Sequence, residues 1–199
     1  MNNNLVNKEL LEGYSETENW FNYEDFYTRA AQAEAYKVYV EVGVWKGHSV
    51  RHLVKELQKT NKEFYVYAVD LWDRLPKDNE LWEKYPEQMP ILRSIYNYNL
   101  IKSNTRKDVF DMICDSVEAA EKFKDETIDF CFIDASHDYE SALKDLEAWF
   151  PKVRKDGVLA GHDINHEPVW RAVHEFFGSK KQSILSNDSK DTWAIIKGH

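Results

Sequence analysis

The feature that most constrains the fold of this chain is a repeated alternation of short apolar runs with amphipathic helical segments. Apolar, β-branched or aromatic runs typical of buried strands occupy 38–43, 64–69, 109–114, 128–133 and 157–160. Helical spacing predicts helices at 24–36, 49–59, 91–101, 117–123, 139–150 and 168–177, and two short closing strands follow at 182–185 and 192–196. Alternating strands and helices predict an α/β fold with a mostly parallel sheet, helices on both faces and an antiparallel pair at one edge.

The chain length of 199 residues favours one domain with a full hydrophobic core. We therefore expect a single domain over 1–199, in which residues 1–36 form an N-terminal cap segment. Residues 71–100 begin with an irregular, proline-containing stretch and are rich in Trp and Tyr. Long irregular stretches inside compact domains are often functional, so this segment is a candidate lid or acceptor pocket. Ordinary packing of a peripheral cap explains the same rings equally well.

The balance of charges argues against a nucleic-acid partner, because 35 Asp and Glu outnumber 26 Lys and Arg and give a formal net charge of -9. No apolar run approaches the ~20 residues that span a bilayer, and the N-terminal residues lack the basic and apolar regions of a secretory signal. Cys114 and Cys131 lie in apolar segments, which favours buried reduced thiols over a disulfide. We therefore expect a cytoplasmic protein without a membrane or nucleic-acid partner.

A glycine-bearing turn follows the first predicted strand, in the stretch VYVEVGVWKGHSV at 38–50. Glu41, Gly43 and Gly47 lie between this strand and the start of a helix. Glycine lets a backbone approach a ligand closely, and a helix start offers unpaired N–H groups, so the turn is typical of nucleotide recognition. Asp70 ends the second strand, where an acidic side chain can accept hydrogen bonds from both hydroxyls of a ribose. The spacing departs from GxGxxG, with Trp45 where a glycine would stand.

Polar side chains also follow the other predicted strands: Asp115 and Ser116 the third, Asp134 the fourth, and His162 and Asp163 the fifth. Any one of them could be only a cap or turn residue. Together with the ends of the first two strands they place polar groups at one edge of the sheet, and ligands of open α/β sheets bind at that carboxyl edge.

With these motifs in place, the chain resembles class I S-adenosylmethionine-dependent methyltransferases. The turn EVGVWKGHS is similar to the E-x-G-x-x-x-G loop of one subgroup, and FIDASHDYESALKDLEAWFPKVRKDGVLAGHD at 132–163 resembles that subgroup over an acidic strand end, an IDxxH turn and a final HD pair. The subgroup includes metal-assisted O-methyltransferases that act on sugars and antibiotic intermediates. The resemblance implies a Rossmann-like methyltransferase fold with a seven-stranded, mostly parallel sheet, an antiparallel edge strand and helices on both faces.

The resemblance also implies a set of cofactor contacts. The turn with Glu41, Gly43 and Gly47 would lie under the methionine part of S-adenosylmethionine, and Ser49 would lie near its carboxylate. Asp70 would bind the ribose hydroxyls and Leu71 would lie beside the adenine, which Asp115 and Ser116 would flank. Asp134 would lie near the sulfonium.

A reaction site follows from the same resemblance. His137 corresponds to a general base, and Asp134, His162 and Asp163 correspond to ligands of a divalent metal such as Mg²⁺ or Mn²⁺. His162 replaces an acidic ligand, so this set is less rich in oxygen than a typical Mg²⁺ site, which favours Mn²⁺, another transition metal or no metal. Simpler roles stay open, since His137 and Asp163 also suit turns and His162 suits a buried pair with a carboxylate.

The function expected is O-methylation of a small molecule or sugar, with metal assistance left open. A metal-independent N- or C-methyltransferase and a non-catalytic cofactor-binding module are the alternatives. A nicotinamide dehydrogenase is less consistent, because GxGxxG is missing. The expected partner is a small-molecule acceptor. The sequence leaves the acceptor and the oligomeric state open, a homodimer included.

Overall fold

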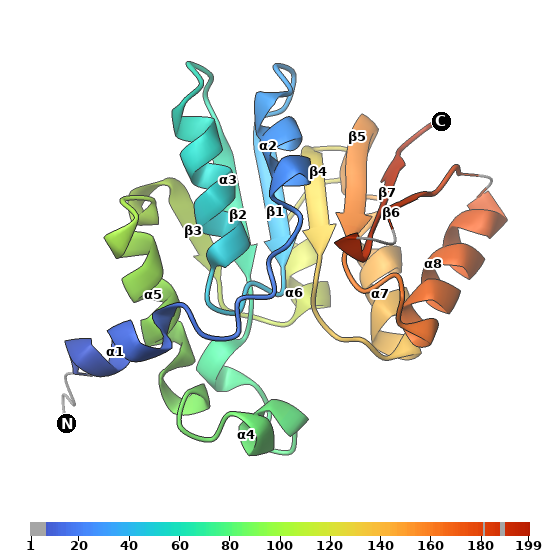
Figure 1. Ribbon diagram of the computed structural model, residues 1–199. Coiled ribbons are helices and arrows are strands. Elements are labelled where there is room, and N and C mark those ends of the chain that lie inside the picture. Colours follow the sequence, from blue (N-terminus) through green and yellow to red (C-terminus); the bar gives the residue numbers. More distant parts are fainter. Residues whose placement is uncertain (1–6, 181, 188–189) are drawn as a thin grey trace.

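One seven-stranded sheet organises the computed structural model, which describes residues 7–180, 182–187 and 190–199. The strand order is β3-β2-β1-β4-β5-β7-β6 (Figure 1). The strands are β1 (Val38–Val42), β2 (Tyr65–Val69), β3 (Val109–Met112), β4 (Ile128–Ile133), β5 (Val153–Gly161), β6 (Leu185–Asn187) and β7 (Thr192–Ile196). The order turns at β1, because β2 and β3 lie on one side of it and β4 on the other, and such a switch point is where open α/β sheets bind ligands.

The direction of the strands confirms a mostly parallel sheet with an antiparallel edge. β1 pairs in parallel with β2 and β4, and the parallel pairing continues from β2 to β3 and from β4 to β5. β7 lies antiparallel to β5, and β6 lies antiparallel to β7. The reversed strand is therefore β7, which lies between β5 and the short outer strand β6.

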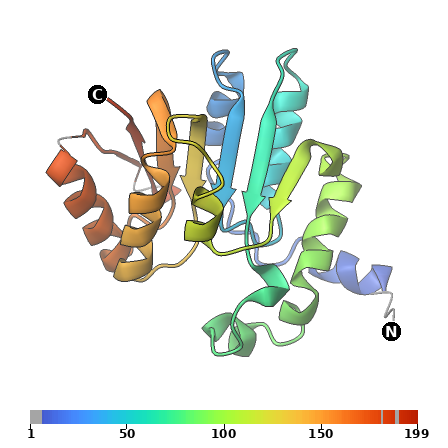
Figure 2. The ribbon, with the colours of Figure 1, turned by 180° about the vertical axis from the view of Figure 1, so that it is seen from behind.

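Helices cover both faces of the sheet, as Figures 1 and 2 show from opposite sides. One face carries α2 (Glu24–Gln32), α3 (His48–Gln58) and α5 (Leu92–Lys102), and the other carries α6 (Ser116–Ala120), α7 (Tyr139–Trp149) and α8 (Glu167–Lys180). α1 (Lys8–Ser15) packs on α5. Short elements complete the chain: η1 (Trp72–Arg74), α4 (Glu80–Lys84), η2 (Met89–Ile91) and η3 (Arg106–Asp108).

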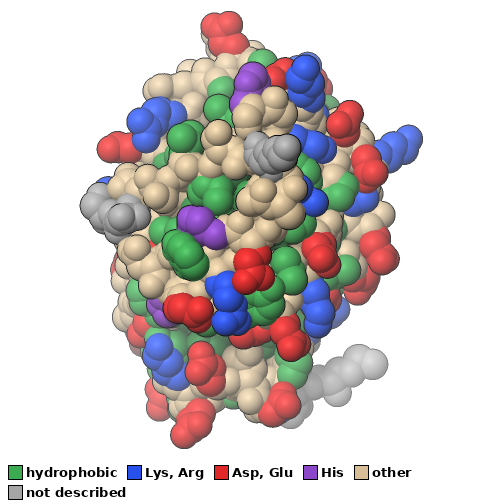
Figure 3. All heavy atoms as spheres, turned by 90° about the vertical axis from the view of Figure 1, so that its right-hand side faces the viewer, with side chains coloured by type: hydrophobic (Ala, Val, Ile, Leu, Met, Phe, Trp, Pro, Cys, Tyr) green, Lys and Arg blue, Asp and Glu red, His purple; other side chains and the backbone are tan. Residues whose placement is uncertain are grey.

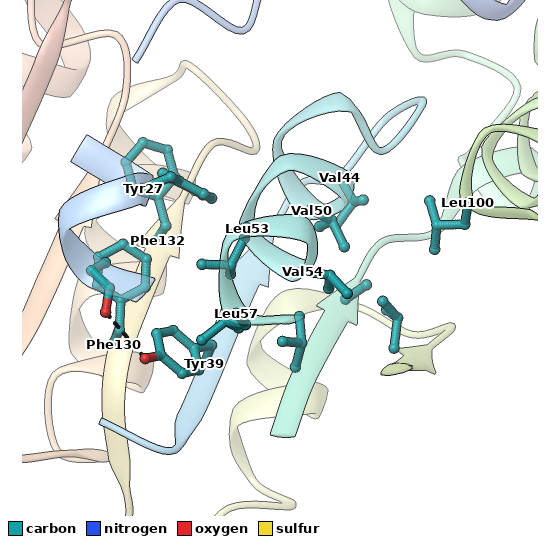
Figure 4. Close-up of a cluster of buried hydrophobic side chains, with 14 of the residues drawn as sticks. Tyr27, Tyr39, Val44, Val50, Leu53, Val54, Leu57, Leu100, Phe130 and Phe132 are labelled. Carbon is teal, nitrogen blue, oxygen red and sulfur yellow. Dashed lines mark hydrogen bonds between the residues drawn. The ribbon is translucent and has the colours of Figure 1, made fainter. Parts of the chain in front are cut away.

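Each central strand contributes to two hydrophobic cores, because successive strand residues point to opposite faces. In β1, Tyr39 belongs to the core under α2 and α3, whereas its neighbour Val40 belongs to the core under α7 and α8. In β4, Phe130 and Phe132 face the first core and Cys131 the second. Figure 4 shows the first core, where side chains of α3 pack against these aromatic rings. Burial on both faces explains why the strands read as continuous apolar runs.

Several element boundaries differ from the predicted ones. The helix predicted over 24–36 ends at Gln32, and β6 occupies Leu185–Asn187 instead of 182–185. β5 begins at Val153, before the predicted 157–160, because Val153 pairs with Ile128 across an irregularity in the ladder. α1 and α4 were not predicted from the pattern, and each begins at an Asn whose side chain accepts a backbone N–H bond, from Glu9 and Leu81 respectively.

The face of the molecule around α8 carries acidic and basic side chains intermixed, with no continuous basic area among the described residues drawn there (Figure 3). No helix in the described ranges combines the length and the apolar character needed to cross a bilayer.

Candidate active site

The glycine turn is built so closely that side chains are excluded from it. Gly43 has a φ of 82°, and a Cβ on it would lie 1.9 Å from the backbone oxygen of Asp134. Its N–H donates to the carbonyl oxygen of Val69 at 2.9 Å, so the turn is fastened to β2 while it touches the end of β4. Gly47 has a φ of 76°, and a Cβ there would lie 2.8 Å from side-chain carbons of Tyr96 and Leu100. Both glycines are therefore required by the local geometry.

Glu41 is a buried carboxyl group at the end of β1, only 2% exposed. Its two oxygens accept hydrogen bonds from the hydroxyl of Ser49 and, at 3.0 Å, from the hydroxyl of Tyr27. Burial raises the pKa of Glu41 to about 8; the two hydroxyl donors lower it, and the nearby carboxylates of Asp134 and Asp70 raise it further. Near neutral pH this side chain is therefore largely protonated in the structure.

Asp70 holds the glycine turn in place. Its Oδ2 accepts the N–H groups of Val44 and Trp45 at 2.8 and 2.9 Å, and its Oδ1 accepts the N–H of Trp72 at 2.6 Å. Burial raises the pKa of Asp70, and these backbone donors act in the opposite direction. The backbone N–H of Leu71 also acts on this carboxylate and lowers its pKa, so the backbone of the turn and of η1 surrounds Asp70. Leu71, next in the chain, is half-buried at the start of η1.

Asp115 and Ser116 lie at the carboxyl end of β3, further along the same edge. The helix predicted over 117–123 implied a cap at Ser116, but Asp115 is the N-cap of α6 and accepts the N–H of Val117 at 2.9 Å. The Ser116 hydroxyl instead accepts the indole N–H of Trp149 at 2.9 Å. The capping prediction was therefore wrong by one residue. Asp115 is exposed and Ser116 half-buried.

The ends of β4 and β5 bring together the three predicted metal ligands. One ligand atom from each of Asp134, His162 and Asp163 lies within 4.8 Å of the others. The Nδ1 atom of His162 lies 3.3 Å from Asp163 Oδ2 and 3.8 Å from Asp134 Oδ1. His137, in the loop after β4, places its Nε2 atom 2.9 Å from the same oxygen of Asp163. All four side chains line one small pocket.

The four titratable side chains of this cluster shift one another's pKa values. Burial raises the pKa of Asp134 to about 6, although His162 acts against this shift. Burial also favours a raised pKa at Asp163, but the hydrogen bonds from His137 and His162 outweigh it and hold that pKa well below its usual range. The hydrogen bond to Asp163 raises the pKa of His137. Burial lowers the pKa of His162, and the two carboxylates reverse this effect to give a raised value.

The chain between α1 and α2 crosses the carboxyl edge of the sheet and makes contacts there that the sequence did not predict (Figure 1). The hydroxyl of Tyr23 donates to Asp134 Oδ2 at 3.0 Å. Lys46, inside the glycine turn, is fully buried and donates to Glu18 and to Thr17. The clustering of Trp20, Phe21 and Tyr23 signalled that this segment docks, but nothing in the pattern indicated where.

His48 corrects a second expectation. A histidine in the first turn of a helix that follows a surface turn is expected at the surface, yet His48 is 6% exposed, and its Nδ1 atom lies 3.8 Å from Glu16 of the segment after α1. Burial lowers the pKa of His48 to about 4, so the ring is neutral near pH 7. A helical face next to the glycine turn is covered by residues far away in the sequence, which local periodicity does not reveal.

Several solved structures that are similar to this chain are methyltransferases. The O-methyltransferase NovP is 15% identical, with a TM-score of 0.70 over 88% of this chain and 79% of its own. The O-methyltransferase from Bacillus cereus, in complex with SAH, is 18% identical, with a TM-score of 0.63 over 97% and 93%. SAH-bound PaMTH1 from Podospora anserina is 10% identical, with a TM-score of 0.70 over 96% and 88%. At these identities the likeness establishes the fold: that of class I methyltransferases.

The family assignment comes from the sequence. A family described as "Methyltransferase domain" matches residues 40–164, well over half of the chain. The chain therefore belongs to this family and is a class I S-adenosylmethionine-dependent methyltransferase, as the resemblance implied. No curated protein is a significant sequence match. The matched range holds every predicted site residue from Glu41 to Asp163 and leaves out Tyr23.

Proposed function

We propose that this protein transfers a methyl group from S-adenosylmethionine to an oxygen atom of a small molecule or sugar. One observation carries the proposal: the glycine turn contacts Asp134, which belongs to the cluster with His137, His162 and Asp163. Gly43 packs so closely on the backbone of Asp134 that a Cβ would lie 1.9 Å from its oxygen. Reacting groups must be held together and in line for a displacement at carbon, so contact between the two half-sites is what this transfer requires.

The proposal assigns the cofactor to the edge between β1 and β3. The methionine part lies on the glycine turn, and the sulfonium points toward Asp134. Asp70, which follows β2 at the carboxyl edge of the sheet, is assigned to the ribose hydroxyls. The residues assigned to the cofactor are Glu41, Gly43, Gly47, Ser49, Asp70, Leu71, Asp115, Ser116 and Asp134. Support comes from their common position along the carboxyl edge of the sheet, on both sides of the switch point at β1 or close to it.

His137 is the proposed general base. Its imidazole is 49% exposed in the side chain and is oriented by Asp163 at 2.9 Å, so it can reach an acceptor that enters from solvent. The acceptor oxygen attacks the methyl carbon, the carbon–sulfur bond breaks, and S-adenosylhomocysteine leaves. The proton of the acceptor hydroxyl passes to His137. Asp163 stabilises the imidazolium that results, because its negative charge lies beside the ring.

The residues at this site fit a divalent cation. Asp134 and Asp163 offer carboxylate oxygens and His162 offers a ring nitrogen, a mixed set that suits Mn²⁺ or another first-row transition ion better than Mg²⁺. In the described part of the chain, the Nε2 atom of His162 is buried without a hydrogen-bond partner. When bound, such an ion would lower the pKa of the acceptor hydroxyl.

The acceptor pocket is proposed to form between the N-terminal cap segment, 1–36, and the lid segment, 71–100. Trp20 of the cap segment is 51% exposed and stacks on Trp45 of the glycine turn with ring centres 5.6 Å apart. Tyr85 of the lid segment completes the aromatic cluster, with its ring centre 5.5 Å from that of Trp45. Exposed indole rings bind the apolar faces of sugars and aromatic molecules, which supports a small-molecule acceptor.

The first experiment measures binding of S-adenosylmethionine by calorimetry and then screens sugars and phenols for formation of S-adenosylhomocysteine. His137→Ala should lower turnover about 10²- to 10⁴-fold while cofactor affinity is retained. His174→Ala, on the exposed side of α8, is the matched control and should leave turnover unchanged. Absence of cofactor binding would contradict the proposal. Full turnover in His137→Ala would show that His137 is not the general base.

Removal of metal separates the two chemical alternatives. If an ion assists, dialysis against a chelator should abolish turnover, and Mn²⁺ should restore it. Full turnover after chelation, with the methyl group found on nitrogen or carbon, would favour the metal-independent alternative instead.

A further inference from the structure

We infer that Tyr23 is a positioning residue, which fixes the orientation of the Asp134 carboxylate and links it to the cofactor turn through an N-terminal strap. The strap is defined as residues 14–23, between α1 and α2. The inference rests on the proposed function of the cluster at Asp134, and it adds a residue outside the range matched by the methyltransferase family.

Tyr23 is held rigidly against the reaction site. It is 3% exposed, its hydroxyl lies 3.0 Å from Asp134 Oδ2, and its ring stacks on Phe132 with centres 4.8 Å apart. The ring centre lies 5.2 Å from that of His162. The Tyr23 hydroxyl is the donor in this hydrogen bond and the carboxylate oxygen is the acceptor.

Because of this hydrogen bond, the two oxygens of Asp134 have different neighbours. Oδ2 accepts from Tyr23, which leaves Oδ1 directed to His162 at 3.8 Å. The terminal torsion of an aspartate is broad and has little preference of its own, so a carboxylate without a partner samples many orientations. Groups that hydrogen-bond a metal ligand from outside the first coordination sphere orient that ligand in this way.

The strap is anchored at the cofactor turn as well. Lys46, between the two glycines, is fully buried and donates to the carboxylate of Glu18 and, at 2.9 Å, to the backbone oxygen of Thr17. Arg51 of α3 makes two 3.0 Å hydrogen bonds to Glu16. A single short segment therefore contacts the turn that receives the cofactor and the carboxylate beside the reacting atoms.

Tyr27 offers a matched control one helical turn away. It is 0% exposed and its hydroxyl donates to a buried carboxylate, that of Glu41, at the same 3.0 Å. Tyr23→Phe and Tyr27→Phe each remove one hydroxyl from a buried tyrosine–carboxylate pair and keep the ring. A loss that reflects weakened packing alone should appear equally in both variants, whereas a loss of Asp134 orientation should appear only in the first.

The experiment titrates Mn²⁺ into the wild-type protein and both variants by calorimetry, after thermal unfolding has shown that all three are folded. Tyr23→Phe should weaken Mn²⁺ binding about 10-fold or more, the range found for second-sphere partners of metal ligands, and Tyr27→Phe should leave it within about twofold. In turnover assays Tyr23→Phe should lower kcat by a similar factor, while the dissociation constant of S-adenosylmethionine changes less than about twofold.

Two results overturn the inference. Either Tyr23→Phe matches the wild type in both Mn²⁺ affinity and kcat, or Tyr27→Phe weakens Mn²⁺ binding as much as Tyr23→Phe does. A wild-type protein that binds neither S-adenosylmethionine nor Mn²⁺ overturns the proposed function itself and the inference with it. The wild-type measurement therefore separates the failure of the function from the failure of the positioning role.

Discussion

The buried carboxyl group of Glu41 gives the protein a pH dependence of stability that Glu41→Gln should remove. Glu41 is buried, and its only described side-chain partners are the hydroxyls of Ser49 and Tyr27. Gln has the same shape, and a hydroxyl can donate or accept, so the amide keeps both contacts. What the substitution removes is the titrating proton.

The size of the effect follows from the two pKa values of Glu41. The pKa is about 8 in the folded protein against an ordinary 4.5, so between these values the folded state binds the proton and the unfolded chain has released it. Stability therefore falls as pH rises through this window. Between pH 6 and pH 9, linkage gives the wild type a loss of roughly 2–3 kcal/mol in the free energy of unfolding relative to Glu41→Gln.

Urea unfolding of both proteins at a series of pH values, with a fixed ionic strength, measures this difference. The two stabilities should diverge between pH 6 and about pH 8 and keep a constant difference above it, with Glu41→Gln the more stable protein at pH 9. The slopes against urea should stay equal. Other titrating groups shift both proteins alike. Parallel stability curves would refute the reasoning, because they would mean that Glu41 is ionised in the folded state without a cost.

Two further substitutions, one of them with a control, test packing at opposite edges of the sheet. Gly43→Ala should destabilise the protein by about 3 kcal/mol or more, since the added Cβ meets the Asp134 backbone at a positive φ, whereas Gly178→Ala in α8, with nothing within 4 Å, should be neutral or slightly stabilising. Asp129→Asn should lower the free energy of unfolding in urea by about 2–4 kcal/mol, because the carboxylate pairs with Arg154 and accepts the N–H groups of Lys37 and Val38 at 2.9 and 2.8 Å. A loss below about 1 kcal/mol would show that an amide serves all three partners as well as the carboxylate does.

The sequence predicted the sheet well because burial on both faces leaves a strong local signal. The runs around Val40, Val66 and Cys131 are largely apolar, as buried parallel strands are, although Glu41 and Asp129 interrupt two of them. The polar residues after these runs mark the carboxyl edge. The clustering of Asp134, His162 and Asp163 followed from this pattern, since β4 and β5 pair in parallel and end at the same edge.

The parts that the sequence did not predict depend on contacts between distant segments. A lysine in a glycine turn has no local reason to be buried, and Lys46 is buried only because Glu18 and Thr17 cover it. The same holds for Tyr23, whose role is visible only once Asp134 is placed beside it. Helix ends were also mislocated, as at Asp115, because neighbouring residues with similar capping ability compete for one position.

The contact between Gly43 and Asp134 has a consequence for ligand-induced stabilisation. The two residues directly follow β1 and β4, which are neighbours in the sheet but are separated by two strands in the chain. The contact therefore exists only after the central part of the sheet has formed. A ligand that bridges them binds the folded chain alone and raises its stability by mass action, by about 2.7 kcal/mol at a concentration 100 times its dissociation constant. Thermal-shift screening of small molecules can therefore find ligands of this site even before the acceptor of the methyl group is identified.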